Sequence, residues 1–167
     1  IEGDPFVGES GREYLFGVVE LSPEGRSEYR ALWAFDAAAE RESFEAIVDL
    51  FSSRRRADPA MHVYHFAAYE PAALKRLAAR LGTRVEEVDQ LLRAKVFVDL
   101  FRIVRQGIRA SVESYSIKKL EPFYGYEREA DLRDAGDARA TLELWLESGS
   151  VERLRGPEDV ALQAVGD

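Results

Sequence analysis

Acidic side chains are the first residues in this chain that suggest chemistry. Glu2 and Asp4 lie two residues apart in a stretch that reads as a β-strand, and side chains at that spacing point to the same face. Two carboxylates on one face of a buried strand are costly unless they are paired or bind a cation. The alternative is an exposed chain end that leaves both groups in water. The pair alone supports both interpretations equally.

A third carboxylate, Glu70, ends the apolar strand predicted over Met61–Glu70, where Pro71 opens a helix. Such a carboxylate can bind a cation, or it can serve only as a cap or dipole partner of the helix. His65 and Tyr69 precede it on the same strand. A lone histidine in an aromatic strand is usually a packed core residue, so His65 has a structural interpretation beside the functional one.

Asp99 lies within the apolar stretch VFVDLF. An ionised group among apolar neighbours needs a partner. A structural salt bridge is the favoured explanation, and direct metal binding follows closely behind it.

A basic stretch, SYSIKKLE, carries Tyr115, Lys118 and Lys119. Two lysines beside an aromatic residue suit a grip on a phosphate backbone. The pattern by itself favours an ordinary capped helix with a basic face.

Composition limits the classes of protein to consider. The 167 residues suit one domain with a real core, and 46% hydrophobic with 32% charged residues is typical of a globular chain. The formal net charge of −8 argues against a protein that simply coats DNA, but less against an enzyme whose clustered carboxylates hold metal ions. No apolar run approaches the roughly 18 residues of a membrane span, and we expect a cytoplasmic protein without membrane association.

Several chemistries are disfavoured by missing residues. The chain has no cysteine, which excludes disulfides, thiolate zinc sites and cysteine nucleophiles. It also has no Walker loop, no G-x-G-x-x-G, no G-x-S-x-G and no H-E-x-x-H motif.

The elements that would position these side chains change along the chain. The first third predicts three strands, and Phe44, Ile47, Val48 and Phe51 then recur at helical spacing. Pro71 and Gly82 bracket a helix at Ala72–Leu81. The remaining expectations are a helix capped by Thr83 with Glu86, a strand or helix at 95–104, a short helix closed by Pro122 and Gly125, a helix at 134–150, and a short helix within Val151–Asp167.

The element order is therefore β-β-β-α-β-α-α followed mostly by helix, which is a mixed α/β layout. We expect strands one to three to form an antiparallel meander, with the fourth crossing back to the sheet after a helix. This is the element order of the ribonuclease H-like fold, a mixed sheet flanked by helices.

Five blocks extend this likeness over nearly the whole chain: IEGDPF, EYLFGVV, MHVYHFAAYEPAALKRLA, VFVDLFRIVRQGIRASVESYSIKKLEPFYGY and ARATLELWLE. Together they resemble the predicted RecB-family nucleases that carry a YprB-like ribonuclease H-like domain. That domain is similar to the DEDD 3′–5′ exonucleases.

The resemblance implies roles for individual residues. Glu2 matches the glutamate of an Asp-x-Glu motif whose aspartate would stand directly before Ile1. Glu70 takes the place of the second-motif aspartate, with His65 and Tyr69 in the flanking positions. Asp99 matches a supporting aspartate, and Asp4 would be a near neighbour of the metal ligands.

The last motif of the family, Tyr-Asn-x-x-Asp, has no match here. Because both missing motifs lie at the ends, we expect residues 1–167 to be a single ribonuclease H-like domain, truncated at both ends and part of a longer chain.

The function that the resemblance implies is a metal-dependent nuclease, 3′–5′ exonuclease-like, using Mg²⁺ or Mn²⁺ on a single-stranded end of DNA or RNA. Tyr115, Lys118 and Lys119 would orient the strand, and this fragment would cut poorly. The alternative is a non-catalytic nucleic-acid-binding or scaffold domain, fused to or associated with a helicase or RecB-type nuclease domain. An acid–base enzyme for sugars or small acids is disfavoured, because nothing fixes a second carboxylate opposite the first.

Overall fold

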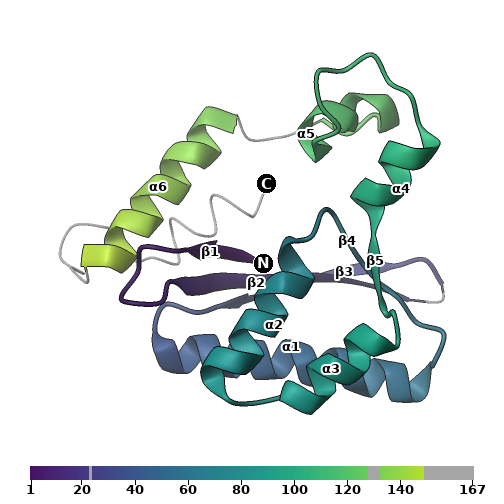
Figure 1. Cartoon of the computed structure of the whole chain (residues 1–167). Helices are drawn as coiled ribbons and strands as arrows, with labels where there is room; N and C mark the ends of the chain where they lie inside the picture. The colour runs from purple at the N-terminus through teal and green to yellow at the C-terminus, as the bar shows by residue number, and fades with distance from the viewer. Residues whose placement is uncertain (23, 128–131, 149–167) are drawn as a thin grey trace. The chain divides into compact units, whose positions relative to one another are not determined.

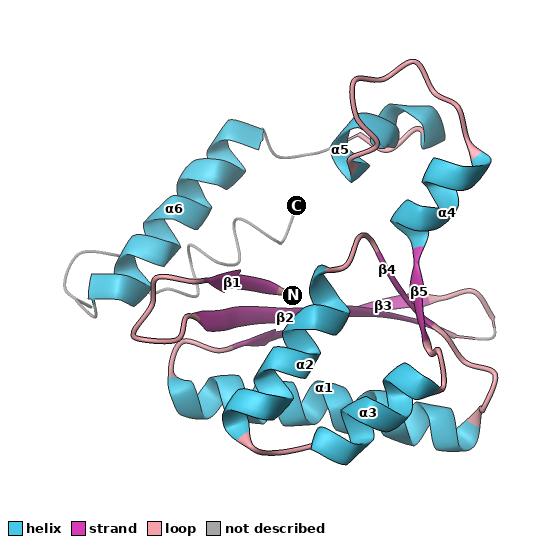
Figure 2. Cartoon of the chain, in the orientation of Figure 1, coloured by secondary structure: helices cyan, strands magenta, loops and turns pink. Residues whose placement is uncertain are grey.

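A computed structural model describes residues 1–22, 24–127 and 132–148 of the chain. The chain divides into two compact units, the first formed by residues 1–3 and 13–120 and the second by residues 4–12 with those from 121 onward. Figures 1 and 2 show the helices and strands of the described residues. The short helix expected within Val151–Asp167 lies outside those residues.

The first sheet contains three strands in the order β1 (Glu2–Asp4), β2 (Arg12–Leu21) and β3 (Ser27–Trp33). Strands β2 and β3 pair antiparallel from Leu15 opposite Trp33 to Leu21 opposite Ser27. Gly25, at a φ of +78°, lies in the turn between them, where its missing Cβ permits the left-handed backbone. The predicted meander of three strands is confirmed.

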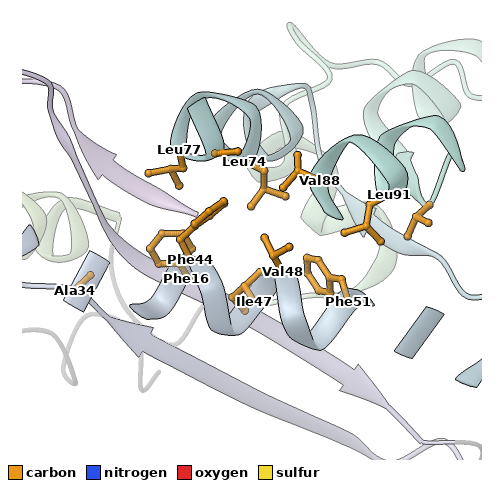
Figure 3. Close-up of a cluster of buried hydrophobic side chains, with 12 residues drawn as sticks. Phe16, Ala34, Phe44, Ile47, Val48, Phe51, Leu74, Leu77, Val88 and Leu91 are labelled. Atoms are coloured by element: carbon orange, nitrogen blue, oxygen red, sulfur yellow. The ribbon is translucent and has the colours of Figure 1, made fainter. Parts of the chain in front are cut away.

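The core of the first unit lies between this sheet and three helices, α1 (Ala37–Ala57), α2 (Tyr69–Leu81) and α3 (Val85–Arg93). Figure 3 shows apolar side chains from all three helices and from β2 pointing toward one another. The helical spacing predicted this buried face of α1 correctly. The largest contributors are Phe16, Phe44, Val48, Leu74, Leu77 and Leu91.

A second sheet holds two short parallel strands, β4 (Val63–His65) and β5 (Phe97–Asp99), with His65 opposite Asp99. The expected single mixed sheet is therefore not found in the described residues, because β4 pairs with β5 in a sheet separate from the meander. The strand expected over Met61–Glu70 is also longer than the observed strand, which spans only Val63–His65. Ala67 adopts a φ of +71°, which breaks the extended backbone after His65.

Helix boundaries near the candidate residues also differ from expectation. Helix α2 begins at Tyr69, so Glu70 lies in its first turn, and it ends as predicted at Gly82 in the left-handed conformation. The predicted Thr83 cap is wrong. The N-cap of α3 is Arg84, and the Thr83 hydroxyl donates instead to Glu45 Oε1 at 2.7 Å. That bond directs the hydroxyl away from the amides that it would have capped.

The remaining elements follow the sequence pattern. The apolar run at 95–104 divides into β5 and helix α4 (Leu100–Gly107). The predicted short helix is α5 (Ile117–Leu120), continued by the 3-10 turn η1 (Glu121–Tyr124), and the late helix is α6 (Leu132–Ser148). Among the described residues, no helix combines the length and apolar character that crossing a bilayer requires.

Candidate functional site

Glu70 lies in the first turn of α2, and the start of that helix lies near the N-terminus of the chain (Figure 1). Its Oε1 lies 3.9 Å from the backbone nitrogen of Ile1, and its Oε2 lies 3.7 Å from Nδ1 of His65. The Oε2 atom is buried, and it has no hydrogen-bond partner among the described residues. Glu70 therefore presents a carboxylate oxygen that is shielded from water and unsatisfied, which is costly unless a cation or donor arrives.

The loop that leads into Glu70 is held by two other candidate residues. His65 Nδ1 lies 2.5 Å from the carbonyl oxygen of Ala67, so this nitrogen carries the proton and donates. The Ala67 N–H donates to Asp99 Oδ1 at 3.0 Å, and the Phe101 N–H donates to the same oxygen at 3.0 Å, capping α4. His65 and Asp99 thus fix the left-handed turn at Ala67 that separates β4 from α2.

Tyr69 is fixed by a buried carboxylate. Its hydroxyl donates to Glu13 Oε2 at 2.9 Å, and Arg76 both pairs with Glu13 and lies over the Tyr69 ring, 6.0 Å from its centroid. Burial, followed by the bond to Glu13, raises the pKa of the Tyr69 phenol to about 12. The phenol therefore stays protonated and keeps its donor role at neutral pH.

The same network reaches α1. The Glu13 N–H donates to Glu40 Oε1 at 2.7 Å, and Arg80 of α2 pairs with Glu40. Glu13 and Glu40 are only 4% and 3% exposed. Sequence reasoning missed both, because their partners lie between 27 and 63 residues away along the chain. The residues next to either glutamate give no local signal of such a partner.

Glu2 and Asp4 share β1 but have different surroundings. Glu2 is exposed, whereas Asp4 is 3% exposed. Asp4 Oδ1 accepts the N–H of Phe6 at 2.9 Å, and its Oδ2 is buried without a partner among the described residues. Glu2 belongs to the unit that contains Glu70, and Asp4 belongs to the other unit.

The candidate substrate-binding residues near α5 are partly engaged in local structure. The Tyr115 hydroxyl donates to the carbonyl of Ile108 at 3.2 Å and accepts the N–H of Ala110 at 3.3 Å. Lys119 Nζ lies 3.3 Å from Glu113 Oε2, while Lys118 is exposed. Tyr115 therefore shapes the loop before α5, and in the described chain no hydrogen bond or ion pair joins these three residues to Glu70.

The donor set fits a divalent cation only in part. Carboxylate oxygens are the ligands that Mg²⁺ and Mn²⁺ prefer, and the unsatisfied Oε2 of Glu70 suits that role. Within residues 1–22, 24–127 and 132–148, however, no three acidic or histidine side chains lie close enough together to hold an ion. The described residues supply one well-placed ligand rather than a complete set.

Comparison with known proteins identifies a family. Neither the curated proteins nor the solved structures gave a match. The family description of the RNase H superfamily matches residues 1–157, which is most of the chain and includes every candidate residue above. Members of that superfamily are usually nucleases. The mixed α/β architecture agrees with this match, and the chain belongs to the RNase H superfamily.

Proposed function

We propose that this chain is a metal-dependent nuclease domain that hydrolyses nucleic-acid phosphodiesters in the manner of a 3′–5′ exonuclease. The observation that carries the proposal is the buried, unsatisfied Oε2 of Glu70 at the start of α2. A carboxylate in that state is stabilised by a bound cation. Glu70 and Glu2 would hold Mg²⁺ or Mn²⁺, and such an ion supplies an activated water and stabilises the leaving oxygen.

The neighbouring candidates support this site mainly by positioning it. His65 Nδ1, the Tyr69 hydroxyl and Asp99 Oδ1 are all engaged in bonds that hold the β4–α2 turn or α2 itself. A ligand that must be held to a fraction of an ångström needs this kind of support. In the proposed enzyme these residues orient Glu70.

A further carboxylate has a defined place in this proposal. A residue added before Ile1 would be joined to its backbone nitrogen, which lies 3.9 Å from Glu70 Oε1. An aspartate there would bring a third carboxylate to the site, beside Glu70 and Glu2.

The test uses the chain with an aspartate added directly before Ile1, together with a 3′-labelled single strand and Mn²⁺. We expect cleavage, and a loss of cleavage on the order of 100-fold in Glu70→Gln. Glu86→Gln is the matched control, because Glu86 is a glutamate in the first turn of the neighbouring helix α3. Calorimetric titration with Mn²⁺ should show weaker binding in Glu70→Gln and unchanged binding in Glu86→Gln. Equal cleavage by both variants would refute the assignment.

The second candidate is a non-catalytic nucleic-acid-binding or scaffold domain, acting beside a helicase or a RecB-type nuclease domain. It is favoured by the incomplete ligand set among the described residues and by the structural bonds of Asp99 and Tyr115. A folded, aspartate-extended protein that binds the labelled strand without cutting it would support this candidate over the nuclease.

A further inference from the structure

A pocket of about 800 Å³ in the first unit is lined in part by His65 and Asp99. Six of its eleven lining residues are apolar and come from the start of α2, α3, β5 and α4, and Lys95, Arg102 and Gln106 add polar groups. We propose that this pocket binds one unstacked nucleotide of a single-stranded nucleic acid, with the base against the apolar wall and a phosphate at Lys95 and Arg102. This inference rests on the proposed nuclease function and names the part of the substrate that the site would take.

The two cations are available for a phosphate. Neither the Lys95 nor the Arg102 side chain forms an ion pair or a hydrogen bond with the described residues. Elsewhere in the same unit, arginines such as Arg76, Arg80 and Arg84 are paired with carboxylates. Cations left without partners beside a pocket are suited to an anionic ligand.

The local charge also differs from that of the whole chain. Residues 95–119 carry six basic and two acidic side chains, a net of +4, whereas the whole chain has a net charge of −8. Phosphate contacts supply much of the affinity of proteins for nucleic acid. In a chain that otherwise repels a polyanion, this segment is a place where a strand can approach.

The backbone at Lys95 strengthens the assignment. Helix α3 ends with the Val96 N–H donating to the Leu91 carbonyl at 3.2 Å and the Lys95 N–H donating to that of Leu92 at 3.0 Å. This is a Schellman motif, and Lys95 occupies its left-handed position at a φ of +55°, where glycine is the usual residue. Glycine would adopt this backbone with less strain. A lysine here is explained if its side chain binds a ligand.

The apolar wall of the pocket favours single-stranded over double-stranded nucleic acid. Phe97, Val98 and Ile103 present partly buried or exposed apolar surface to the pocket. Bases bind such surfaces by stacking and apolar contact, with little dependence on sequence. A base inside a duplex is already stacked on its neighbours, so only a single strand or a frayed end can place one here.

The test measures binding without cleavage, by fluorescence anisotropy of a labelled oligothymidylate in EDTA. Lys95→Gly and Arg102→Gln should each weaken binding roughly three- to tenfold and reduce its salt dependence. The Lys95→Gly protein should remain folded, because glycine suits the backbone there. Lys75→Gln is the matched control. Lys75 is an exposed residue of α2, its side chain makes no ion pair with the described residues, and it does not line the pocket.

Competition identifies the ligand. Deoxythymidine monophosphate should displace the strand better than either thymidine or inorganic phosphate, and Ile103→Asn should remove that advantage. A labelled duplex of the same length should bind more weakly than the single strand. Phosphate competing as well as the nucleotide would overturn the base assignment, since the pocket would then be an anion site only.

The two proposals fail separately. Wild-type protein that does not bind the strand, or Lys95→Gly and Arg102→Gln proteins that match Lys75→Gln, would overturn the nucleotide pocket whatever the cleavage assay shows. If these variants lose binding while the aspartate-extended chain never cuts, the pocket stands and the nuclease function fails.

Discussion

The acidic side chains at helix α2 differ in whether their buried oxygens have partners. Glu13 and Glu40 are almost fully buried, and each is matched to an arginine of α2. Glu70, at the start of the same helix, keeps one buried oxygen without a hydrogen-bond partner in the described chain.

The difference separates stability from function. Breaking a buried ion pair is costly because it leaves one charge uncompensated. A buried oxygen without a hydrogen-bond partner instead lowers the stability of the fold. Its presence is therefore better explained by function than by stability. Glu13 and Glu40 hold α2 in place, whereas Glu70 keeps an oxygen that no hydrogen bond within the described chain uses.

The largest predicted effect tests this contrast directly. Glu40→Gln should destabilise the protein by about 2 kcal/mol, because it leaves the Arg80 guanidinium without its carboxylate; partial exposure of Arg80 limits the cost. Glu70→Gln should cost nothing or stabilise slightly, since it removes an unsatisfied carboxylate. Urea unfolding followed by circular dichroism measures both. Equal losses of stability would remove the distinction between the two groups.

Variants of Asp99 test whether this residue only supports the fold or also binds metal. Asp99→Ala removes the acceptor for two N–H groups and should cost about 1.5 kcal/mol in the same unfolding experiment. Asp99→Asn keeps an acceptor oxygen and should retain most of the stability. If Asp99 also binds metal, the asparagine variant would lose Mn²⁺ affinity while remaining stable; a scaffold role predicts that both are retained.

The Tyr69 phenol, which is bonded to the buried Glu13, should make the stability of the protein depend on pH. Its pKa rises from 10.0 to about 12 in the folded state, so the protonated phenol is favoured by folding. The stability that it contributes is fully present below pH 10 and is lost as the pH rises toward 12. The gap in unfolding free energy between wild type and Tyr69→Phe should therefore narrow over that range. A constant gap would mean that the bond to Glu13 does not control the phenol.

The smallest predicted effect concerns the backbone at Lys95. Lys95→Gly should stabilise the protein by about 0.5 kcal/mol, because it relieves a left-handed residue that carries a Cβ. Gly82→Ala is the reciprocal control, since Gly82 ends α2 at a φ of +63° and alanine there should destabilise. Thermal unfolding distinguishes the two directions. A loss of stability in Lys95→Gly would show that the lysine side chain supports the fold.

Local signals in the sequence predicted much of the framework. Apolar spacing located the buried face of α1, and Gly82 located the end of α2. Pro71 marked the first turn of α2, although Glu70 lies in that turn rather than at the end of the preceding strand. These predictions succeed because each depends on residues within a few positions of one another.

The wrong or missing predictions concern features that depend on residues far apart in the sequence or that have no local signal. Nothing about alanine signals the left-handed backbone at Ala67 that shortens β4, and nothing near Thr83 reveals that Glu45 takes its hydroxyl. The separation of β4 and β5 from the meander likewise depends on long-range pairing. Glu13 was missed altogether, because its partners Tyr69 and Arg76 lie 56 and 63 residues away along the chain.

The bond from Ala67 to Asp99 also bears on how the molecule assembles. These residues are 32 positions apart, and all of α2 and α3 lies between them. Parallel strands so separated can pair only after the intervening chain has folded back, which makes this contact a late event in folding. The turn before Glu70 should accordingly open more readily than the core around Phe16, and amide hydrogen exchange at Ala67 would report that opening. Opening of this turn would give Glu70 room to move when a ligand binds.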